Sequence, residues 1–159
     1  MSTKRELLKD KKRWVLNMGK IIGFNIPGDP QGKLRARTVW GGKRTYTPQK
    51  TADYEELIRW SYRRVSKDIF DQEEPLEVCI VAWFKPPKST PKYKACNMLK
   101  QLIYPTKKPD IDNIAKIILD ALNGVAYKDD TQVIDLKVSK RYAKKASVAV
   151  IIQEREHQR

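Results

Sequence analysis

The chain has 159 residues, of which 40% are hydrophobic and 33% charged, a composition that fits one domain with a buried core. No apolar run reaches the roughly 18 residues of a membrane helix, and the charged N-terminus lacks the apolar segment of a secretory signal. The single histidine, His157, argues against a Ser-His-Asp triad or a histidine zinc site. Cys79 and Cys96 lack partners at zinc spacing, so we expect reduced cysteines in a cytoplasmic protein.

The charge balance points to a polyanionic partner. Lysine and arginine total 33 against 19 acidic residues, a net charge of +14. Residues 1–20 hold seven basic and two acidic side chains, or +5, so +9 belongs to the rest of the chain. A basic domain of this size favours nucleic acid, although a basic protein without such a partner is the alternative. We expect a basic N-terminal arm or helix over 1–18, a folded domain over 19–153 and a polar tail over 154–159.

The first third of the chain predicts a strand and a basic hairpin. Ile21 to Ile26 is β-prone and ends at a Pro-Gly-Asp-Pro turn, and Gly41-Gly42 lies between two short β-prone pieces. Basic residues alternate there with Trp40 and Tyr46, which suits contact with phosphates and bases, although an ordinary exposed hairpin reads the same way. The basic residues that we expect to contact DNA in this part are Lys33, Arg35, Arg37, Lys43 and Arg44.

Thr47-Pro48 is a typical helix start, and the pattern that follows predicts a helix to about Phe70. One face of this helix is apolar at helical spacing, so we expect it in the core rather than at a cofactor. Its members are Tyr54, Leu57, Ile58, Ser61, Tyr62, Val65 and Ile69.

A second strand is predicted over Leu76 to Phe84, rich in β-branched and aromatic residues. Residues 78–109 contain seven lysines and no acidic residue, and this run leads directly into Asp110. Such a positive approach suits a DNA backbone held beside carboxylates, while a solvated lysine-rich loop and helix is the alternative. The DNA-contact candidates here are Lys85, Lys88, Lys107 and Lys108.

The stretch from Lys108 to Val133 carries the candidate chemistry. Asp110 and Asp112 stand at the start of a short apolar helix that ends at Asn123-Gly124, and Lys116 lies one turn beyond Asp112 on the same face. Asp129-Asp130 then precedes another strand. Carboxylate oxygens are ligands that magnesium prefers, although a helix cap and a turn would explain each pair separately. An EF-hand calcium loop does not fit the spacing.

Gln132 to Tyr142 and Ala146 to Ile152 are the last predicted strands, with a turn between them. Four strands with helices between and outside them predict an α/β or α+β domain with one mixed four-stranded sheet.

The motif Asp110-x-Asp112-Asn113-x-x-Lys116, followed by Asp120-Ala-Leu-Asn-Gly124 and Asp129-Asp130-x-Gln132-Val133, resembles the signature of the RusA family of Holliday junction resolvases. These are endonucleases of bacteria and their phages that act in DNA recombination and repair. The resemblance implies a RusA-like fold, a homodimer, a branched DNA substrate and Mg²⁺, for which Mn²⁺ would substitute. It also implies the catalytic set, which matches Asp110, Asp112, Lys116 and Asp130.

On this hypothesis Asp110, Asp112 and Asp130 bind the metal, with Asp129 as helper or alternate, and Lys116 stabilises charge on the phosphate. Asp120 either orients Lys116 or is a solvated helix residue. A catalytically silent protein that binds branched DNA and a nuclease specific for flaps or forks remain as alternatives. A nucleotide-binding enzyme is not supported, because the chain has no glycine-rich phosphate loop.

Overall fold

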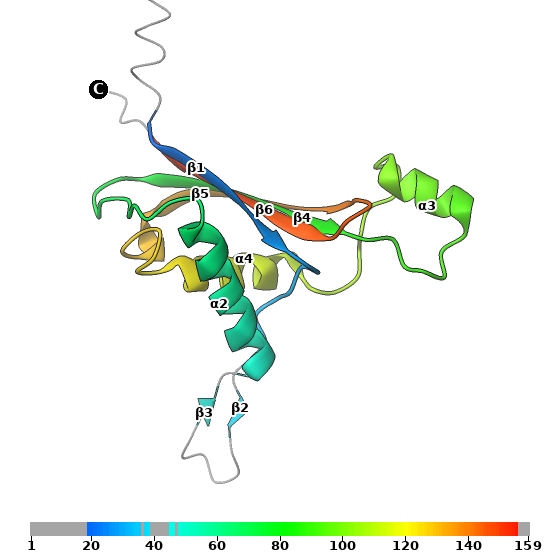
Figure 1. The fold of residues 1–159 in the computed structure, drawn as a ribbon, viewed down its shortest axis with the longest axis horizontal. Helices are drawn as coiled ribbons and strands as arrows, with labels where there is room; N and C mark the ends of the chain where they lie inside the picture. The colour runs from blue at the N-terminus through cyan, green and yellow to red at the C-terminus, as the bar shows by residue number, and fades with distance from the viewer. Residues whose placement is uncertain (1–18, 36, 39–44, 47, 156–159) are drawn as a thin grey trace, which may run out of the picture.

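The computed structural model describes residues 19–35, 37–38, 45–46 and 48–155 (Figure 1). The N-terminal arm, most of the tail and the predicted Gly41-Gly42 turn lie outside this part of the chain. The strands are β1 (Ile21–Pro27), β2 (Arg37–Thr38), β3 (Thr45–Tyr46), β4 (Leu76–Phe84), β5 (Val133–Tyr142) and β6 (Ser147–Glu154). The helices are α2 (Gln49–Arg63), α3 (Lys92–Leu99), α4 (Ile111–Leu122) and the 3-10 turn η1 (Asp130–Gln132).

Four of the strands form one sheet in the order β1-β6-β4-β5. The pairs β1–β6 and β4–β6 are antiparallel and β4–β5 is parallel, so the predicted mixed four-stranded sheet is confirmed. The short strands β2 and β3 form a separate antiparallel pair. That pairing is the one expected of a hairpin between residues 37 and 46.

The core lies on one face of the sheet, where α2 and α4 pack (Figure 1). Buried and less buried side chains alternate along β1, β4 and β6, because successive residues of a strand point to opposite faces. Helix α4 supplies the most apolar helical surface, since half of its twelve residues are buried. Packing of this surface orients the polar side of α4 away from the sheet.

Helix α2 ends at Arg63, seven residues before the predicted end near Phe70. The chain turns away so that Phe70 can enter the core, where its N–H donates to the Ala126 carbonyl at 2.8 Å. The predicted apolar face is buried or half-buried as far as Tyr62, but Val65 and Ile69 are 58% and 49% exposed. Their assignment to the core was therefore wrong, because a tertiary contact of Phe70 overrides the helical pattern.

The parallel pair β4–β5 requires a long crossover, since parallel neighbours cannot be joined by a tight turn. Here the crossover runs from Phe84 through α3, α4 and η1 to Val133. All the candidate catalytic residues lie within it. Within the described residues, no helix has the length and apolar character needed to cross a membrane.

Candidate functional site

Asp110 occupies the N-cap position of α4, yet its carboxylate makes no capping hydrogen bond. Only its backbone carbonyl serves the helix, by accepting from the Ile114 N–H at 3.1 Å. The side chain is exposed, as is that of Asp112 in the first turn. Capping therefore does not account for Asp110, and both carboxylates have oxygens available to a ligand.

Lys116 lies one turn along α4 from Asp112 and is exposed to solvent. The neighbouring Ile114, Ile117 and Ile118 are buried against the sheet, which holds the opposite side of the helix outward. Within the described part of the chain Lys116 forms no ion pair. Its ammonium is thus free to meet an anion on the surface that Asp112 shares.

Asp129 has a structural task, because it caps η1. Its Oδ1 accepts from the Thr131 N–H at 2.9 Å, and the Gln132 side chain accepts in return from the Asp129 N–H. The hydrogen bond from the Thr131 backbone lowers the pKa of the Asp129 carboxyl. Asp129 is therefore a fully ionised capping residue.

Asp130 differs from its neighbour. Partial burial, the hydrogen bond and charge of Asp129, and the charge of Asp120 raise the pKa of the Asp130 carboxyl. Burial and the charges of Asp130 and Asp120 also raise the pKa of Tyr127, whose hydroxyl donates to the Leu119 carbonyl at 3.0 Å. The turn η1 is in contact with α4, and Asp130 therefore lies where the negative charges of Asp129 and Asp120 act on it, as in sites that bind a cation.

Gln132 fixes this turn in place, and sequence reasoning used it only as part of the motif. The side chain is buried, with 7% exposed. Its amide donates to the carbonyls of Asp71 and Glu74, and its oxygen accepts from the N–H groups of Lys128 and Asp129. A polar residue directly before the apolar Val133-Ile134 of the predicted strand was the available signal.

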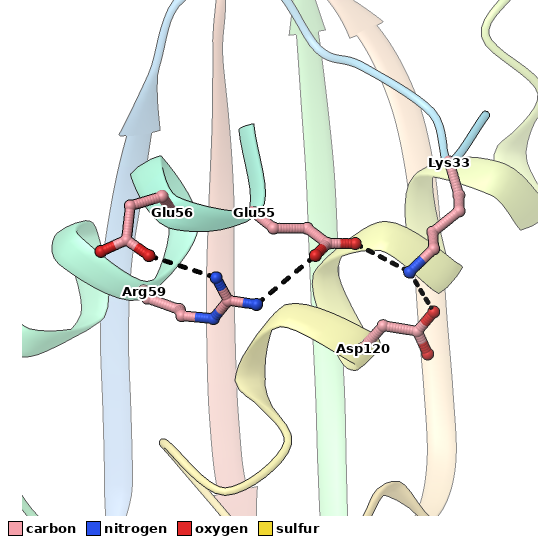
Figure 2. Close-up of polar contacts among 5 residues, drawn as sticks. All are labelled: Lys33, Glu55, Glu56, Arg59 and Asp120. Carbon is pink, nitrogen blue, oxygen red and sulfur yellow. Dashed lines mark hydrogen bonds and ion pairs between the residues drawn. The ribbon is translucent and has the colours of Figure 1, made fainter. Parts of the chain in front are cut away.

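Lys33, expected to contact DNA, is held in a salt-bridge cluster between α2 and α4 (Figure 2). Its Nζ lies 2.7 Å from Glu55 Oε1 and 2.7 Å from Asp120 Oδ2. Arg59 approaches the other Glu55 oxygen at 3.4 Å and Glu56 at 3.2 Å. Asp120 thus pairs with Lys33. It is neither a merely solvated residue nor a partner that orients Lys116, the two roles considered from the sequence.

Burial alone would lower the pKa of Lys33, but the hydrogen bonds and charges of Asp120 and Glu55 outweigh it and raise that pKa overall. The segment around Lys33 is also fastened to α4 by backbone contacts. The Lys33 N–H donates to the Asn113 carbonyl at 2.9 Å. A Cβ on Gly32 would lie 2.9 Å from the Asn113 Cβ, so this close approach requires glycine.

The other basic candidates are exposed wherever the structure describes their side chains, namely Arg35, Lys85, Lys88, Lys107 and Lys108. Arg37 lies in β2, and Lys43 and Arg44 fall outside the described residues. A groove of about 340 Å³ adjoins Asp110 and is bordered by Lys33, Lys50 and Lys108. Lys50 and Lys108 therefore place positive charge beside Asp110, whereas the charge of Lys33 is already paired.

No three Asp, Glu, His or Cys side chains in the described ranges are grouped tightly enough to hold an ion as they stand. Carboxylate oxygens are the ligands that a hard divalent cation prefers, and those of Asp110 and Asp112 are exposed at the start of α4. Such a cation commonly keeps waters and uses substrate phosphates as further ligands. A site of this kind is completed by the bound substrate.

Exposed carboxylates and an exposed lysine lie on one helix of a mixed-sheet domain, with basic residues nearby. These are the side chains that a protein acting on a phosphodiester backbone uses. Residues 27–153 match the family model described as Endodeoxyribonuclease RusA. The chain belongs to the RusA family of endodeoxyribonucleases. It is also 36% identical over 139 residues to a Bacillus subtilis (strain 168) protein named "Uncharacterized protein YqaN", an alignment covering 84% of this chain and 96% of that one.

Proposed function

We propose that this protein is a magnesium-dependent endodeoxyribonuclease that resolves Holliday junctions by paired, symmetric phosphodiester cuts during DNA recombination and repair. The observation that carries the proposal is that the Asp110 carboxylate, at the N-cap position of α4, makes no capping hydrogen bond. This carboxylate stands beside Asp112 and Lys116 in a chain of the RusA family. Mn²⁺ is expected to replace Mg²⁺ in the reaction.

Asp110, Asp112 and Asp130 would hold the metal. Asp130 is preferred over Asp129 because an Asp129 oxygen is engaged in capping η1, whereas the Asp130 carboxylate caps no helix. When bound, the ion supplies an acidified water and a positive charge at the scissile phosphate. Charge crowding around Asp130 disfavours its anion in the free protein, so a cation there relieves repulsion.

Lys116 would contact a phosphoryl oxygen, where its charge stabilises the negative charge that develops during the cut. Two features favour this role. Lys116 is exposed, and it shares its side of α4 with Asp112. The exposed lysines that precede Asp110 would hold the flanking backbone, which positions the strand before the reaction.

Two symmetric cuts require two active sites, so we propose a homodimer. The face of the sheet opposite α2 and α4 supports this proposal, because no described helix covers it (Figure 1). Ile21 and Ile151 on this face are 45% and 46% exposed, and Cys79 and Val81 lie between them and β5. Ile151→Glu should convert a dimer to a monomer in light scattering, while Lys67→Glu, in the exposed segment after α2, should not.

The activity is tested by cleavage of a labelled four-way junction, with linear duplex and flap DNA as substrate controls. Wild type should make paired cuts in Mg²⁺ and none in chelator, and Asp110→Asn should make none in either. The matched control is Asp68→Asn, which changes an exposed aspartate that pairs with Lys20 and should leave cutting intact.

Each other outcome selects an alternative. Cutting confined to flaps would keep the chemistry but change the substrate, and tight binding without cutting in any metal would indicate a silent binding protein. Full cutting by Asp110→Asn would overturn the assignment of the carboxylates. We place the reaction in the cytoplasm of a bacterium or phage-infected cell, where branched DNA arises.

A further inference from the structure

Residues 85–109, here named the α3 projection, have no part in the core. Helix α3 lies beyond the end of the sheet, apart from α2 and α4 (Figure 1). Of its eight residues only Met98 is buried. An eight-residue helix rarely persists alone in water, so its retention as an ordered element needs an explanation other than stability.

The segment that follows α3 is held against β5. Helix α3 ends in a turn with Gln101 at a φ of 60°, closed by the Leu102 N–H donating to the Asn97 carbonyl at 2.9 Å. The Gln101 side chain donates to the Tyr142 carbonyl at 2.7 Å, and the Arg141 guanidinium lies 5.0 Å from the Tyr104 ring centre. The projection is thus fastened to the end of β5.

A second attachment connects the projection to the candidate site. Lys140 on β5 donates to the carbonyls of Lys107 and Pro109, the latter at 3.0 Å. Asp110 follows at once. The position of the α3 projection is therefore set by the same short segment that positions the first carboxylate.

The exposed surface of the projection carries only positive charge. Lysines 92, 94 and 100 are exposed on or next to α3, and residues 85–109 include no acidic residue. Tyr93 is 72% exposed and Tyr104 52%. Lysines interleaved with exposed tyrosines suit a nucleic-acid backbone and any unstacked base better than they suit an acidic protein.

We infer that the α3 projection contacts the backbone of a duplex arm that lies away from the scissile strand, and so makes the protein prefer branched DNA to linear duplex. This inference rests on the proposed junction substrate. Helix α3 is about 12 Å long, comparable to three or four base pairs, and it stands at a distance from the carboxylates. A linear duplex placed on the carboxylates has no second arm to meet it.

The test compares Lys92→Ala/Lys94→Ala/Lys100→Ala with a control of equal charge change, Arg63→Ala/Arg64→Ala/Lys67→Ala at the end of α2. All six side chains are exposed, and substitutions at such surface positions usually change stability little, so both variants should keep a melting temperature close to that of wild type. Binding to a labelled four-way junction and to linear duplex is measured by anisotropy in chelator, from 50 to 300 mM salt.

We expect the projection variant to lose about 10- to 100-fold in junction affinity, with the slope of log affinity against log salt falling by about 2 to 3. Its affinity for linear duplex should fall less than about 3-fold, and the control should behave like wild type on both. Equal losses on both DNAs, or a projection variant matching the control, would overturn the inference. Lys92→Glu/Lys94→Glu should enlarge the junction-specific loss.

The same experiment distinguishes an error in the proposed junction substrate from an error in the role of the α3 projection. If wild type binds junction and duplex equally, the junction substrate itself is wrong, whatever the variants do. If wild type prefers the junction and the projection variant retains that preference, only the role of the α3 projection is wrong. A projection variant that instead loses a protein partner while keeping DNA binding would assign this surface to protein contact and contradict the inference.

Discussion

Lys33→Met tests the salt-bridge cluster that joins α2 to α4. The change keeps the length of the side chain but removes the charge that lies 2.7 Å from both Glu55 and Asp120. The side chains of Lys33, Glu55 and Asp120 are 25%, 14% and 30% exposed, so the cluster is intermediate between a surface and a buried ion pair. A surface pair contributes about 0.2–1 kcal/mol, and disrupting a buried pair costs about 3–5 kcal/mol. We therefore expect a loss of about 2 kcal/mol in the free energy of unfolding.

For a domain of this size the loss corresponds to a fall of roughly 4–8 °C in Tm, measured by calorimetry at pH 7. The pH dependence has a definite sign. Because folding raises the pKa of Lys33, its contribution is complete below the ordinary lysine pKa of 10.5 and disappears as pH rises through the folded-state value. The difference between wild type and variant should therefore shrink as the pH rises into the alkaline range.

A double-mutant cycle identifies the pair. Lys33→Met and Asp120→Asn should be non-additive by about 1 kcal/mol, because each removes the same contact. Lys67→Met, which changes an exposed lysine, serves as the control and should leave Tm within about 1 °C. An unchanged Tm in Lys33→Met, or strictly additive effects in the cycle, would refute the view that this cluster holds the two helices together.

Three further predictions concern the site. Gln132→Leu should lower the free energy of unfolding by about 2–4 kcal/mol in urea titrations, because it leaves buried backbone groups without partners; a loss below about 0.5 kcal/mol would contradict this. Gly32→Ala should lower the free energy of unfolding by about 1–3 kcal/mol, because the new Cβ would meet Asn113. A melting curve like that of wild type would show instead that the segment can shift. Asp130→Asn should raise Tm in chelator at pH 7, because the raised pKa of Asp130 means that its anion opposes folding above about pH 3.8; a lowered Tm would argue that the charge is compensated.

The helix that carries the candidate residues could be predicted from the sequence because it is one short, contiguous apolar stretch. Helix α4 has strong apolar periodicity and a clear end, so Asp110, Asp112 and Lys116 could be placed on it from spacing alone. The strands of the sheet were likewise predicted from local composition. Such features depend on neighbours within a few residues, and these are what a sequence displays directly.

Contacts between distant segments could not be predicted from the sequence. Lys33 pairs with Asp120 across 87 positions of sequence, and nothing local indicates that its charge is engaged. Phe70 ends α2 early by pairing with Ala126, which local helix propensity does not express. Helix α3 was not predicted as a separate element, because its polar composition gives little periodic signal.

The α3 projection begins after Phe84, at the end of β4, and leads into α4 at Asp110. It is therefore a segment within one crossover. Since it contributes little to the core, its length and charge can change in evolution without disturbing the packing of α4. If the α3 projection contacts DNA as inferred above, mutations in it would alter which DNA is favoured while Asp110, Asp112 and Lys116 stay unchanged. A family built on this plan can diversify its targets while its chemistry stays constant.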